Sequence, residues 1–297
     1  MDEFELIRRV VAELGEQTQA PQVVLGPGDD AAIIAPTPDW HMVASIDTQV
    51  ADRHFPRTAP AELIGYRAVM ASVSDLAAMA ARPVYMLVAL TLDEVDADWV
   101  MALTRGMKAA TKDCEIALCG GNFSRGPLAL TLSVHGEVPA GGGLLRSGAR
   151  VGDVIQVSGP LGGAGACVRA GDFTVAAKLS LTQQRYFRPR ARVDLSEQLR
   201  DTAHAVIDVS DGLLQDLQHV LTASQVGAEL EAATIPVCPG ANLEDALHGG
   251  EDYELLVAAS TTLDGFSAIG RVVAQPSLTL DGRVVEARGY DHFRDAP

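Results

Sequence analysis

The chain has 297 residues, of which 47% are hydrophobic and only 5% aromatic, and it carries a formal net charge of −16 at pH 7. This much aliphatic material excludes a disordered chain and predicts two domains of comparable size, each with its own core. The negative charge repels nucleic-acid phosphates and anionic lipids, so neither a nucleic acid nor a membrane is an expected partner. No apolar run reaches the roughly 20 residues that span a bilayer. The acidic start at Asp2 and Glu3 does not resemble a signal peptide, so we expect a cytoplasmic protein.

Hydrophobic periodicity and turn residues predict an alternation of helices and strands in the first half of the chain. Apolar residues recur at i, i+3, i+4 and i+7 between Phe4 and Leu14, a spacing typical of an amphipathic helix that Gly15 would end. The other predicted elements are helices at 59–81 and 97–112 and strands at 23–25, 31–34, 42–46, 85–92, 116–119 and 128–138. This order predicts an α/β or α+β N-terminal domain.

A glycine-rich break at residues 139–143 separates the two halves, so we predict an N-terminal domain at 1–140 and a C-terminal α/β domain at 150–297. The second half is expected to open with a strand and a glycine-rich turn at 158–165 that leads into a helix. Amides of this turn could bind a phosphate, although close helix packing explains its small residues equally well. The elements predicted in this half are helices at 195–203 and 211–223 and strands at 154–157, 205–209, 228–230 and 253–258.

Acidic residues stand repeatedly at the ends of apolar runs. They are Asp29, Asp30, Asp47, Asp75, Asp208, Asp211, Glu251 and Asp252. Carboxylate oxygens are ligands that Mg²⁺ prefers, and functional side chains often gather on loops at the ends of strands. A turn or a helix N-cap explains any one of these motifs as well, as at Asp211. Because several acidic motifs occur together and the chain has only three lysines, we favour a phosphate site in which bound metal supplies the positive charge.

Other nucleotide-binding and metal-binding signatures are absent. The sequence contains no P-loop and no protein-kinase motif set. Residues 26–31 match the glycine pattern of dinucleotide-binding folds in letters, but a strand is predicted at 31–34 where that fold needs a helix. The four cysteines lack metal-binding spacing and are predicted to be buried thiols. His54 lies in a predicted loop, where a lone histidine is more often structural or solvated than functional.

Ten short motifs follow one another along nearly the whole chain. They are Gly-Asp-Asp (28–30), Ser-Ile-Asp-Thr (45–48), His-Phe (54–55), Ser-Asp-Leu-Ala-Ala-Met (74–79), Gly-Gly (120–121), Arg-Gly-Pro (125–127), Arg-Ser-Gly (146–148), Ile-Asp-Val-Ser-Asp-Gly-Leu (207–213), Gly-Gly-Glu-Asp-Tyr-Glu-Leu (249–255) and Gly-Tyr-Asp-His-Phe (289–293). Together they resemble the thiamine-monophosphate kinase family. The last two motifs distinguish that family from the rest of the aminoimidazole ribonucleotide synthetase superfamily.

The resemblance implies a two-domain fold of the aminoimidazole ribonucleotide synthetase type. Its N-terminal domain would pair with that of a second copy, so that the strands of a homodimer form a shared barrel, and a C-terminal α/β domain would close over the bound nucleotide. The implied reaction is transfer of the γ-phosphoryl group of ATP to thiamine monophosphate, which yields thiamine diphosphate.

The resemblance also implies roles for individual residues. The implied ligands of several Mg²⁺ ions are Asp30, Ser45, Asp47, Asp75, Asp208 and Asp211, with Asn122 at a position where the family normally has an aspartate. The implied ATP contacts are Gly121, Arg146 and Ser210, and the implied contacts to thiamine monophosphate are His54, Glu251 and Tyr290. No general base is expected, because the acceptor phosphate is already largely ionised near neutral pH and the reaction needs mainly alignment and charge neutralisation.

Two alternatives remain open from the sequence. One is another enzyme of the same superfamily, such as selenide, water dikinase or the hydrogenase-maturation carbamoyl dehydratase. Selenide, water dikinase usually has a reactive cysteine or selenocysteine near its start, whereas the first cysteine here is Cys114, so this enzyme is disfavoured. The carbamoyl dehydratase has a cysteine at its end, whereas the last residues here are Asp295, Ala296 and Pro297, so it is disfavoured too. The other is a nucleotide-binding homologue that has lost turnover, and Asn122 is the feature that favours it.

Overall fold

The structure is a computed structural model that describes residues 3–175 and 178–290. The chain divides into two compact units. The N-terminal unit comprises the chain up to Gly142 without the segment Ala77–Ala80, and the C-terminal unit comprises that segment and the chain from Gly143 onward. None of the helices within the described ranges is both long and apolar enough to cross a bilayer.

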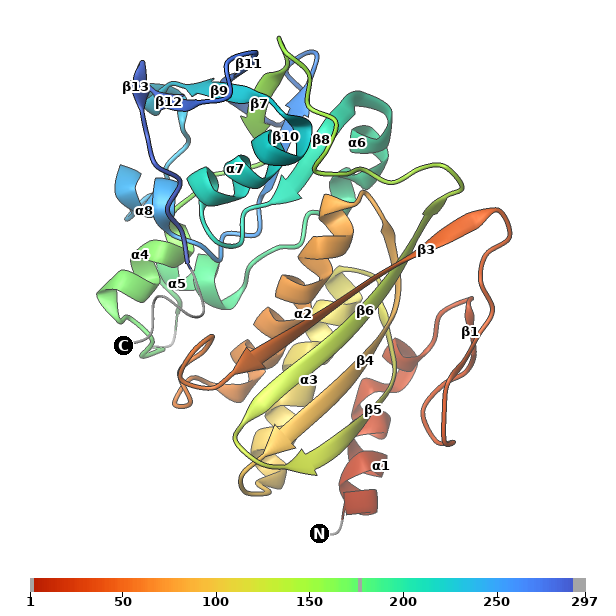
Figure 1. The fold of residues 1–297 in the computed structure, drawn as a ribbon. Helices are drawn as coiled ribbons and strands as arrows, with labels where there is room; N and C mark the ends of the chain where they lie inside the picture. Colours follow the sequence, from red (N-terminus) through yellow and green to blue (C-terminus); the bar gives the residue numbers. More distant parts are fainter. Residues whose placement is uncertain (1–2, 176–177, 291–297) are drawn as a thin grey trace. The chain divides into compact units, whose positions relative to one another are not determined.

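A four-stranded mixed sheet forms the centre of the N-terminal unit (Figure 1). Its strands, in spatial order, are β3 (Trp40–Val50), β6 (Ala129–Pro139), β4 (Arg82–Leu92) and β5 (Ala117–Arg125). The first three are antiparallel neighbours, whereas β4 and β5 are parallel and are connected through helix α3 (Ala97–Asp113). Strands β1 (Val23–Leu25) and β2 (Ile33–Ile34) pair separately before β3. The strands β3 and β5 are therefore the two edges of this sheet.

Helices cover one face of this sheet and leave the other face open. Figure 1 shows α2 (Ala61–Ala78) and α3 behind the strands, and α1 (Glu3–Leu14), which runs into the short helix η1 (Gly15–Thr18), lies against α3. Alternate residues of β4 are buried under the helices, namely Val84, Met86, Val88, Leu90 and Leu92. The residues between them point to the open face, because side chains along a strand alternate between its two sides.

A seven-stranded sheet forms the centre of the C-terminal unit. In spatial order its strands are β13 (Arg283–Val284), β12 (Leu278–Leu280), β9 (Gly227–Leu230), β11 (Ser267–Val273), β7 (Val154–Val157), β10 (Leu255–Ala259) and β8 (Ala203–Asp208). The neighbours are antiparallel except for β9 and β12. The remaining elements are α4 (Gly163–Ala170), α5 (Leu181–Phe187), η2 (Val193–Leu195), α6 (Ser196–Thr202), α7 (Leu213–Ser224), η3 (Ala232–Thr234) and α8 (Leu243–His248).

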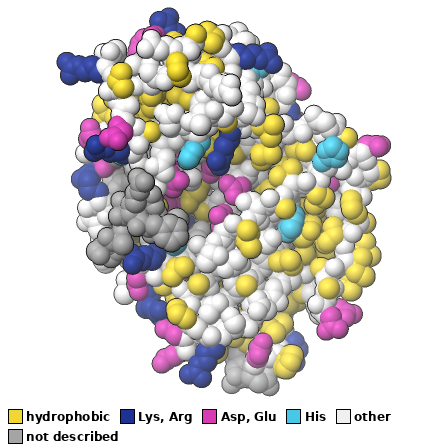
Figure 2. All heavy atoms as spheres, in the orientation of Figure 1, with side chains coloured by type: hydrophobic (Ala, Val, Ile, Leu, Met, Phe, Trp, Pro, Cys, Tyr) yellow, Lys and Arg dark blue, Asp and Glu magenta, His cyan; other side chains and the backbone are white. Residues whose placement is uncertain are grey.

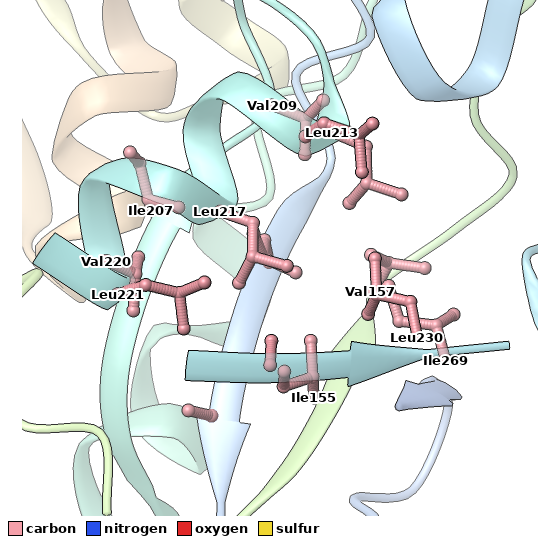
Figure 3. Packing of buried hydrophobic residues seen from close by; sticks show 14 of the residues in the cluster. Ile155, Val157, Ile207, Val209, Leu213, Leu217, Val220, Leu221, Leu230 and Ile269 are labelled. Carbon is pink, nitrogen blue, oxygen red and sulfur yellow. The ribbon is translucent and has the colours of Figure 1, made fainter. Parts of the chain in front are cut away.

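Helix α7 packs on one face of the seven-stranded sheet. Its apolar residues Leu213, Leu217 and Leu221 join a core with the alternate strand residues Ile207 and Ile155 (Figure 3). The intervening strand residues face the other way and form a second cluster with Leu199 of α6. This packing fixes the start of α7 directly beyond the end of β8.

The helices and strands predicted from the sequence are present, with changes at several ends. Strand β3 runs to Val50 and strand β5 to Arg125, further than their apolar cores indicate, because polar residues continue the hydrogen-bonded pairing. The helices and strands that were not predicted are α5, α8, β11, β12 and β13. All four cysteines are buried and free, as predicted.

Two glycines allow α2 and α3 to cross at very close range. A Cβ atom on Gly65 would lie 2.2 Å from the carbonyl oxygen of Leu103, and one on Gly106 would lie 1.8 Å from the carbonyl oxygen of Glu62. Both obstacles are backbone atoms of the other helix, so a side chain at either position must push the helices apart.

We expect Gly106→Ala to lower the free energy of unfolding by about 1–3 kcal/mol, because the added methyl group overpacks the helix crossing. In a helix with free space around the glycine, the same change would stabilise the protein by roughly 0.5–1 kcal/mol. A loss of stability therefore indicates the close helix crossing. Urea unfolding followed by circular dichroism measures it. The control is Arg105→Ala at the neighbouring exposed position; a Gly106→Ala protein at least as stable as this control would contradict the close crossing.

Candidate functional site

Strand β3 and helix α2 bring Ser45 and Asp75 together. The Ser45 hydroxyl donates a hydrogen bond to Asp75 Oδ2 at 2.5 Å. Asp47 lies two residues further along β3, and its partner Leu132 in β6 is fully buried, so Asp47 shares the helix-covered face with Ser45. Three oxygen-bearing side chains predicted to bind metal therefore belong to one side of this sheet.

Asn122 lies on the opposite face of the same sheet. It pairs with Ala89, which pairs with Thr131, and these residues belong to the open-face set. The hydrogen bond of 2.9 Å between the next open-face pair, Thr91 and Ser124, confirms this assignment of faces. Since β3 and β5 are also opposite edges, the structure does not bring Asn122 to the Asp47 side chain within one chain.

The adjacent Gly121 is held against β4. A Cβ atom at this position would lie 2.0 Å from the carbonyl oxygen of Val88, so only glycine fits here without moving a strand. Asp30 and His54 lie in loops before and after β3. Asp30 is exposed and its amide donates to Asp29 Oδ1, whereas His54 Nδ1 accepts the amide of Val50 at 3.0 Å. A neutral His54 therefore carries its proton on Nε2.

The loop Ser210–Gly212 joins β8 to α7 and contains two predicted site residues, Ser210 and Asp211. Asp208 is buried at the end of β8, two residues before Ser210. The loop folds around the side chain of Asp216, whose Oδ2 accepts the amides of Ser210, Asp211 and Gly212 at 3.0, 3.0 and 3.1 Å. Burial, followed by the negative charge of Asp208, raises the pKa of Asp216 to about 7.

Two further predicted segments are hydrogen-bonded to this loop. The amide of Glu251 donates to the Ser210 carbonyl at 2.8 Å, and the amide of Tyr290 donates to the Asp211 carbonyl at 3.1 Å. Gln215 reinforces the second contact, because its Nε2 donates to the Tyr290 carbonyl at 2.9 Å. The structure therefore brings together Ser210, Asp211, Glu251 and Tyr290, although residues 291–293 of the last motif lie outside the described residues.

The backbone at Glu251 is strained. Glu251 and Tyr253 have φ angles of 71° and 52°, in the left-handed region. For residues with a side chain this conformation costs on the order of 1–3 kcal/mol and is concentrated at functional sites. The Tyr253 hydroxyl donates to Glu251 Oε2 at 2.5 Å, which directs the Glu251 carboxylate.

Arg146 lies on a turn that the end of α7 holds in place. The Ser224 hydroxyl donates to the Arg146 carbonyl at 3.1 Å and accepts the amides of Gly148 and Ala149 at 3.1 and 3.2 Å. The Arg146 side chain is exposed on this turn. One helix, α7, therefore supports both the Ser210–Gly212 loop and the Arg146 turn, and nothing in the sequence marked Asp216 or Ser224 for this role.

Two acidic residues near Glu251 have structural partners. Asp252 accepts the amides of Gly162 and Ala164 at 2.6 and 3.4 Å, so these two amides at the start of α4 bind a carboxylate of their own chain and not a phosphate. Burial raises the pKa of Asp252 to about 7. Glu254 accepts hydrogen bonds from Arg185 at 2.9 Å and Arg192 at 2.6 Å, so these two arginines are paired inside the C-terminal unit.

The candidate metal ligands have the chemistry that magnesium requires. Ser45, Asp47 and Asp75 offer hydroxyl and carboxylate oxygens on one face, and Asp208 and Asp211 offer carboxylates next to Asp216, whose pKa is raised first by burial and then by the negative charge of Asp208. Among residues 3–175 and 178–290, no group of three or more His, Cys, Asp or Glu side chains is arranged to hold a metal ion. Within these residues neither set is a complete coordination shell by itself, and magnesium commonly completes its shell with water and substrate phosphates.

The chain is similar to proteins of known family along nearly its whole length. The family described as AIR synthase related protein matches it with its N-terminal domain at residues 28–138 and its C-terminal domain at 150–282. The thiamine-monophosphate kinase of Salmonella typhimurium is 37% identical, and the match covers 98% of each chain.

Solved structures agree with this assignment. Thiamine-monophosphate kinase from Stenotrophomonas maltophilia has a TM-score of 0.87 at 35% identity, covering 96% of this chain and 98% of that one. AaThiL complexed with AMPPCP and TMP has a TM-score of 0.81 at 29% identity, covering 99% of each. The two-domain arrangement of mixed α/β sheets predicted from the motifs is thereby confirmed. The chain belongs to the AIR synthase related protein family and, within it, to the thiamine-monophosphate kinases.

Proposed function

We propose that the protein catalyses ATP-dependent phosphorylation of thiamine monophosphate to thiamine diphosphate, with Mg²⁺ as the cofactor and the cytoplasm as its location. The observation that carries this proposal is the meeting of three predicted motif segments at Ser210, Glu251 and Tyr290. The complex of the similar protein AaThiL with AMPPCP and TMP supports ATP and thiamine monophosphate as the two substrates.

In this proposal the acidic residues bind metal and the neighbouring residues bind nucleotide. The proposed Mg²⁺ ligands are Asp30, Ser45, Asp47, Asp75, Asn122, Asp208 and Asp211, and the proposed ATP contacts are Gly121, Arg146 and Ser210. When bound, Mg²⁺ neutralises the negative charge that keeps two phosphate groups apart. The Ser45 hydroxyl orients the Asp75 carboxylate, and the exposed Arg146 guanidinium can donate to phosphate oxygens.

The remaining residues are proposed to hold the acceptor. His54, Glu251 and Tyr290 contact thiamine monophosphate, and a neutral His54 with its proton on Nε2 can donate a hydrogen bond to it. The Glu251 carboxylate, directed by Tyr253, complements the positive charge of the thiazolium ring. No residue needs to remove a proton, because the attacking phosphate oxygen is already ionised, so the protein's task is alignment.

We expect the enzyme to phosphorylate thiamine monophosphate and not unphosphorylated thiamine, because the proposed site aligns a phosphate oxygen with ATP. Release of ADP, coupled to pyruvate kinase and lactate dehydrogenase, measures turnover with each acceptor, and chromatography identifies thiamine diphosphate. Equal or faster turnover of thiamine would contradict the proposal. Binding of ATP without ADP release would support a nucleotide-binding homologue instead.

We expect Asp75→Ala to lower turnover on the order of 100-fold or more, because it removes a carboxylate proposed to bind metal and the group that Ser45 contacts. The thermal midpoint without ligand should stay the same or rise slightly, since one of several like charges is lost. The control is Asp98→Ala, an exposed aspartate in the first turn of α3. Wild-type activity of Asp75→Ala at millimolar Mg²⁺ would show that Asp75 serves only as a structural partner of Ser45.

We further propose that the open face of the N-terminal sheet is the contact between two copies of the chain. Exposed apolar residues Met42, Ile46 and Leu87 belong to this face, and Figure 2 shows apolar side chains gathered over the strands of the N-terminal unit. A homodimer also accounts for the separation of Asn122 from Asp47, which lie on opposite faces and edges of the sheet. Asn122 can act together with Asp47 only when the two residues come from different copies of the chain.

We expect Ile46→Glu to convert a dimer into a monomer, because it places a charge on a residue that is 66% exposed and would become buried in the contact. Sedimentation velocity of the wild type and the variant measures the change. Val284→Glu, at an apolar position 77% exposed in the C-terminal unit, is the control and should remain dimeric. A monomeric wild-type protein, or an Ile46→Glu variant that stays dimeric, would exclude this face as the contact.

A further inference from the structure

Every backbone polar group from Val209 to Gly212 has a partner in the C-terminal unit. Three amides, those of Ser210, Asp211 and Gly212, donate to the single oxygen Asp216 Oδ2. The carbonyls of Ser210 and Asp211 accept the amides of Glu251 and Tyr290, and the Gly212 carbonyl accepts the amide of Asp216. Val209 is paired through its amide and its carbonyl with Glu254 and Tyr253. This loop therefore connects two distant segments while its own amides all point to one carboxylate.

We propose that Asp216 is a positioning residue for phosphoryl transfer, one that sets the shape of the loop and thereby the places of Asp211, Glu251 and Tyr290. The proposal rests on the function proposed above. Asp216 contacts neither substrate in this view; it acts through the residues that do. Its side chain is only 2% exposed, so no solvent molecule can readily replace the oxygen that the three amides share.

The geometry exceeds what capping of α7 alone requires. A capping side chain normally satisfies one or two of the free amides at a helix start. Here the three amides belong to consecutive residues, and two of them precede the N-cap residue Gly212. Gathering them on one side turns the carbonyls of Ser210 and Asp211 outward, toward the amides of Glu251 and Tyr290. Asp216 therefore caps the start of α7 and also turns the Ser210 and Asp211 carbonyls toward their donors.

The loop is also closely enclosed, so it has few alternative conformations. Gly212 has a φ of 125°, and a Cβ atom on it would lie 2.8 Å from the His248 carbonyl oxygen. A Cβ on Gly250 would lie 2.2 Å from the Ser210 carbonyl oxygen, and one on Gly289 would lie 2.5 Å from that of Asp211. Glycine at these positions allows the partner backbones to reach the carbonyls. Removing the central carboxylate should therefore change the loop and both attached segments together.

The experiment compares Asp216→Ala, Asp216→Asn and the control Gln156→Ala. Asparagine keeps one oxygen that can accept the amides, whereas alanine keeps none. Gln156 is equally buried in the same unit and also holds backbone, since it accepts the Leu263 amide at 2.8 Å and donates to the Thr261 carbonyl at 3.1 Å, away from the loop. Its loss should destabilise the unit without altering the site.

Four quantities are measured for each protein. The first two are the Mg²⁺ concentration at half-maximal rate and the KM for thiamine monophosphate relative to kcat. The third is hydrogen exchange of the Ser210, Asp211 and Gly212 amides without any ligand, and the fourth is binding of Mg²⁺-ATP by calorimetry. We expect Asp216→Ala to raise the Mg²⁺ requirement and KM about 10- to 100-fold and to lose protection of the three amides. Asp216→Asn should keep the Mg²⁺ requirement, the KM and the amide protection close to their wild-type values. Gln156→Ala should lower only thermal stability.

The proposal is overturned if Asp216→Ala loses stability as Gln156→Ala does while its Mg²⁺ requirement and KM stay at wild-type values. Should Asp216→Ala not fold, protected amides in the wild type with a small rise of KM in Asp216→Asn support the proposal, and rapid amide exchange in the folded wild type overturns it. If the proposed function is wrong, the wild-type protein will already release no ADP. Amide exchange and Mg²⁺-ATP binding would then still decide the role of Asp216.

Discussion

The pairing of buried backbone groups around Asp216 organises the C-terminal part of the site. A buried amide or carbonyl without a partner costs about as much as a lost hydrogen bond, so a loop that enters the interior must find a partner for each group. The Ser210–Gly212 loop gives its amides to one carboxylate and its first two carbonyls to Glu251 and Tyr290. Segments far apart in the sequence meet at this loop because each of them also needs hydrogen-bond partners for its buried backbone groups.

Much of the fold could be predicted because its longer elements have clear hydrophobic periodicity. The helices α1, α2, α3 and α7 and the strands of both sheet centres follow from apolar spacing and from glycine and proline breaks. The elements that escaped prediction are short or polar. Helix α5 has seven residues and starts at a capping box formed by Ser180 and Gln183, and β11 contains the charged Arg271 next to Gly270. Their stability comes from tertiary partners that the local sequence does not reveal.

The candidate site can be proposed from the sequence as a set of motifs, but its arrangement in space cannot. Two residues on different strands can be assigned to the same or opposite faces of a sheet only when the strand register is known. The separation of Asn122 from Asp47 therefore follows from the strand pairing and not from the motifs. The residues that support the loops, Asp216, Gln215 and Ser224, stand within an ordinary amphipathic helix. Their sequence positions resemble any polar residue on such a helix, and only the three-dimensional contacts separate them from solvated neighbours.

The abundance of acidic residues therefore has two physical explanations in one protein. Asp216 and Asp252 are buried and gather backbone amides, and Glu254 is buried between two arginines, so these carboxylates already have their compensating charge or dipoles within the fold. Asp75 Oδ2, by contrast, accepts one hydroxyl, that of Ser45, and a carboxylate has further lone pairs with which it can coordinate a cation. A carboxylate satisfied by several donors builds the site, whereas one with oxygen atoms still able to coordinate can bind metal. In the proposed function, carboxylates of the second kind bind the Mg²⁺ that lets a chain with net charge −16 and three lysines accept two phosphorylated substrates.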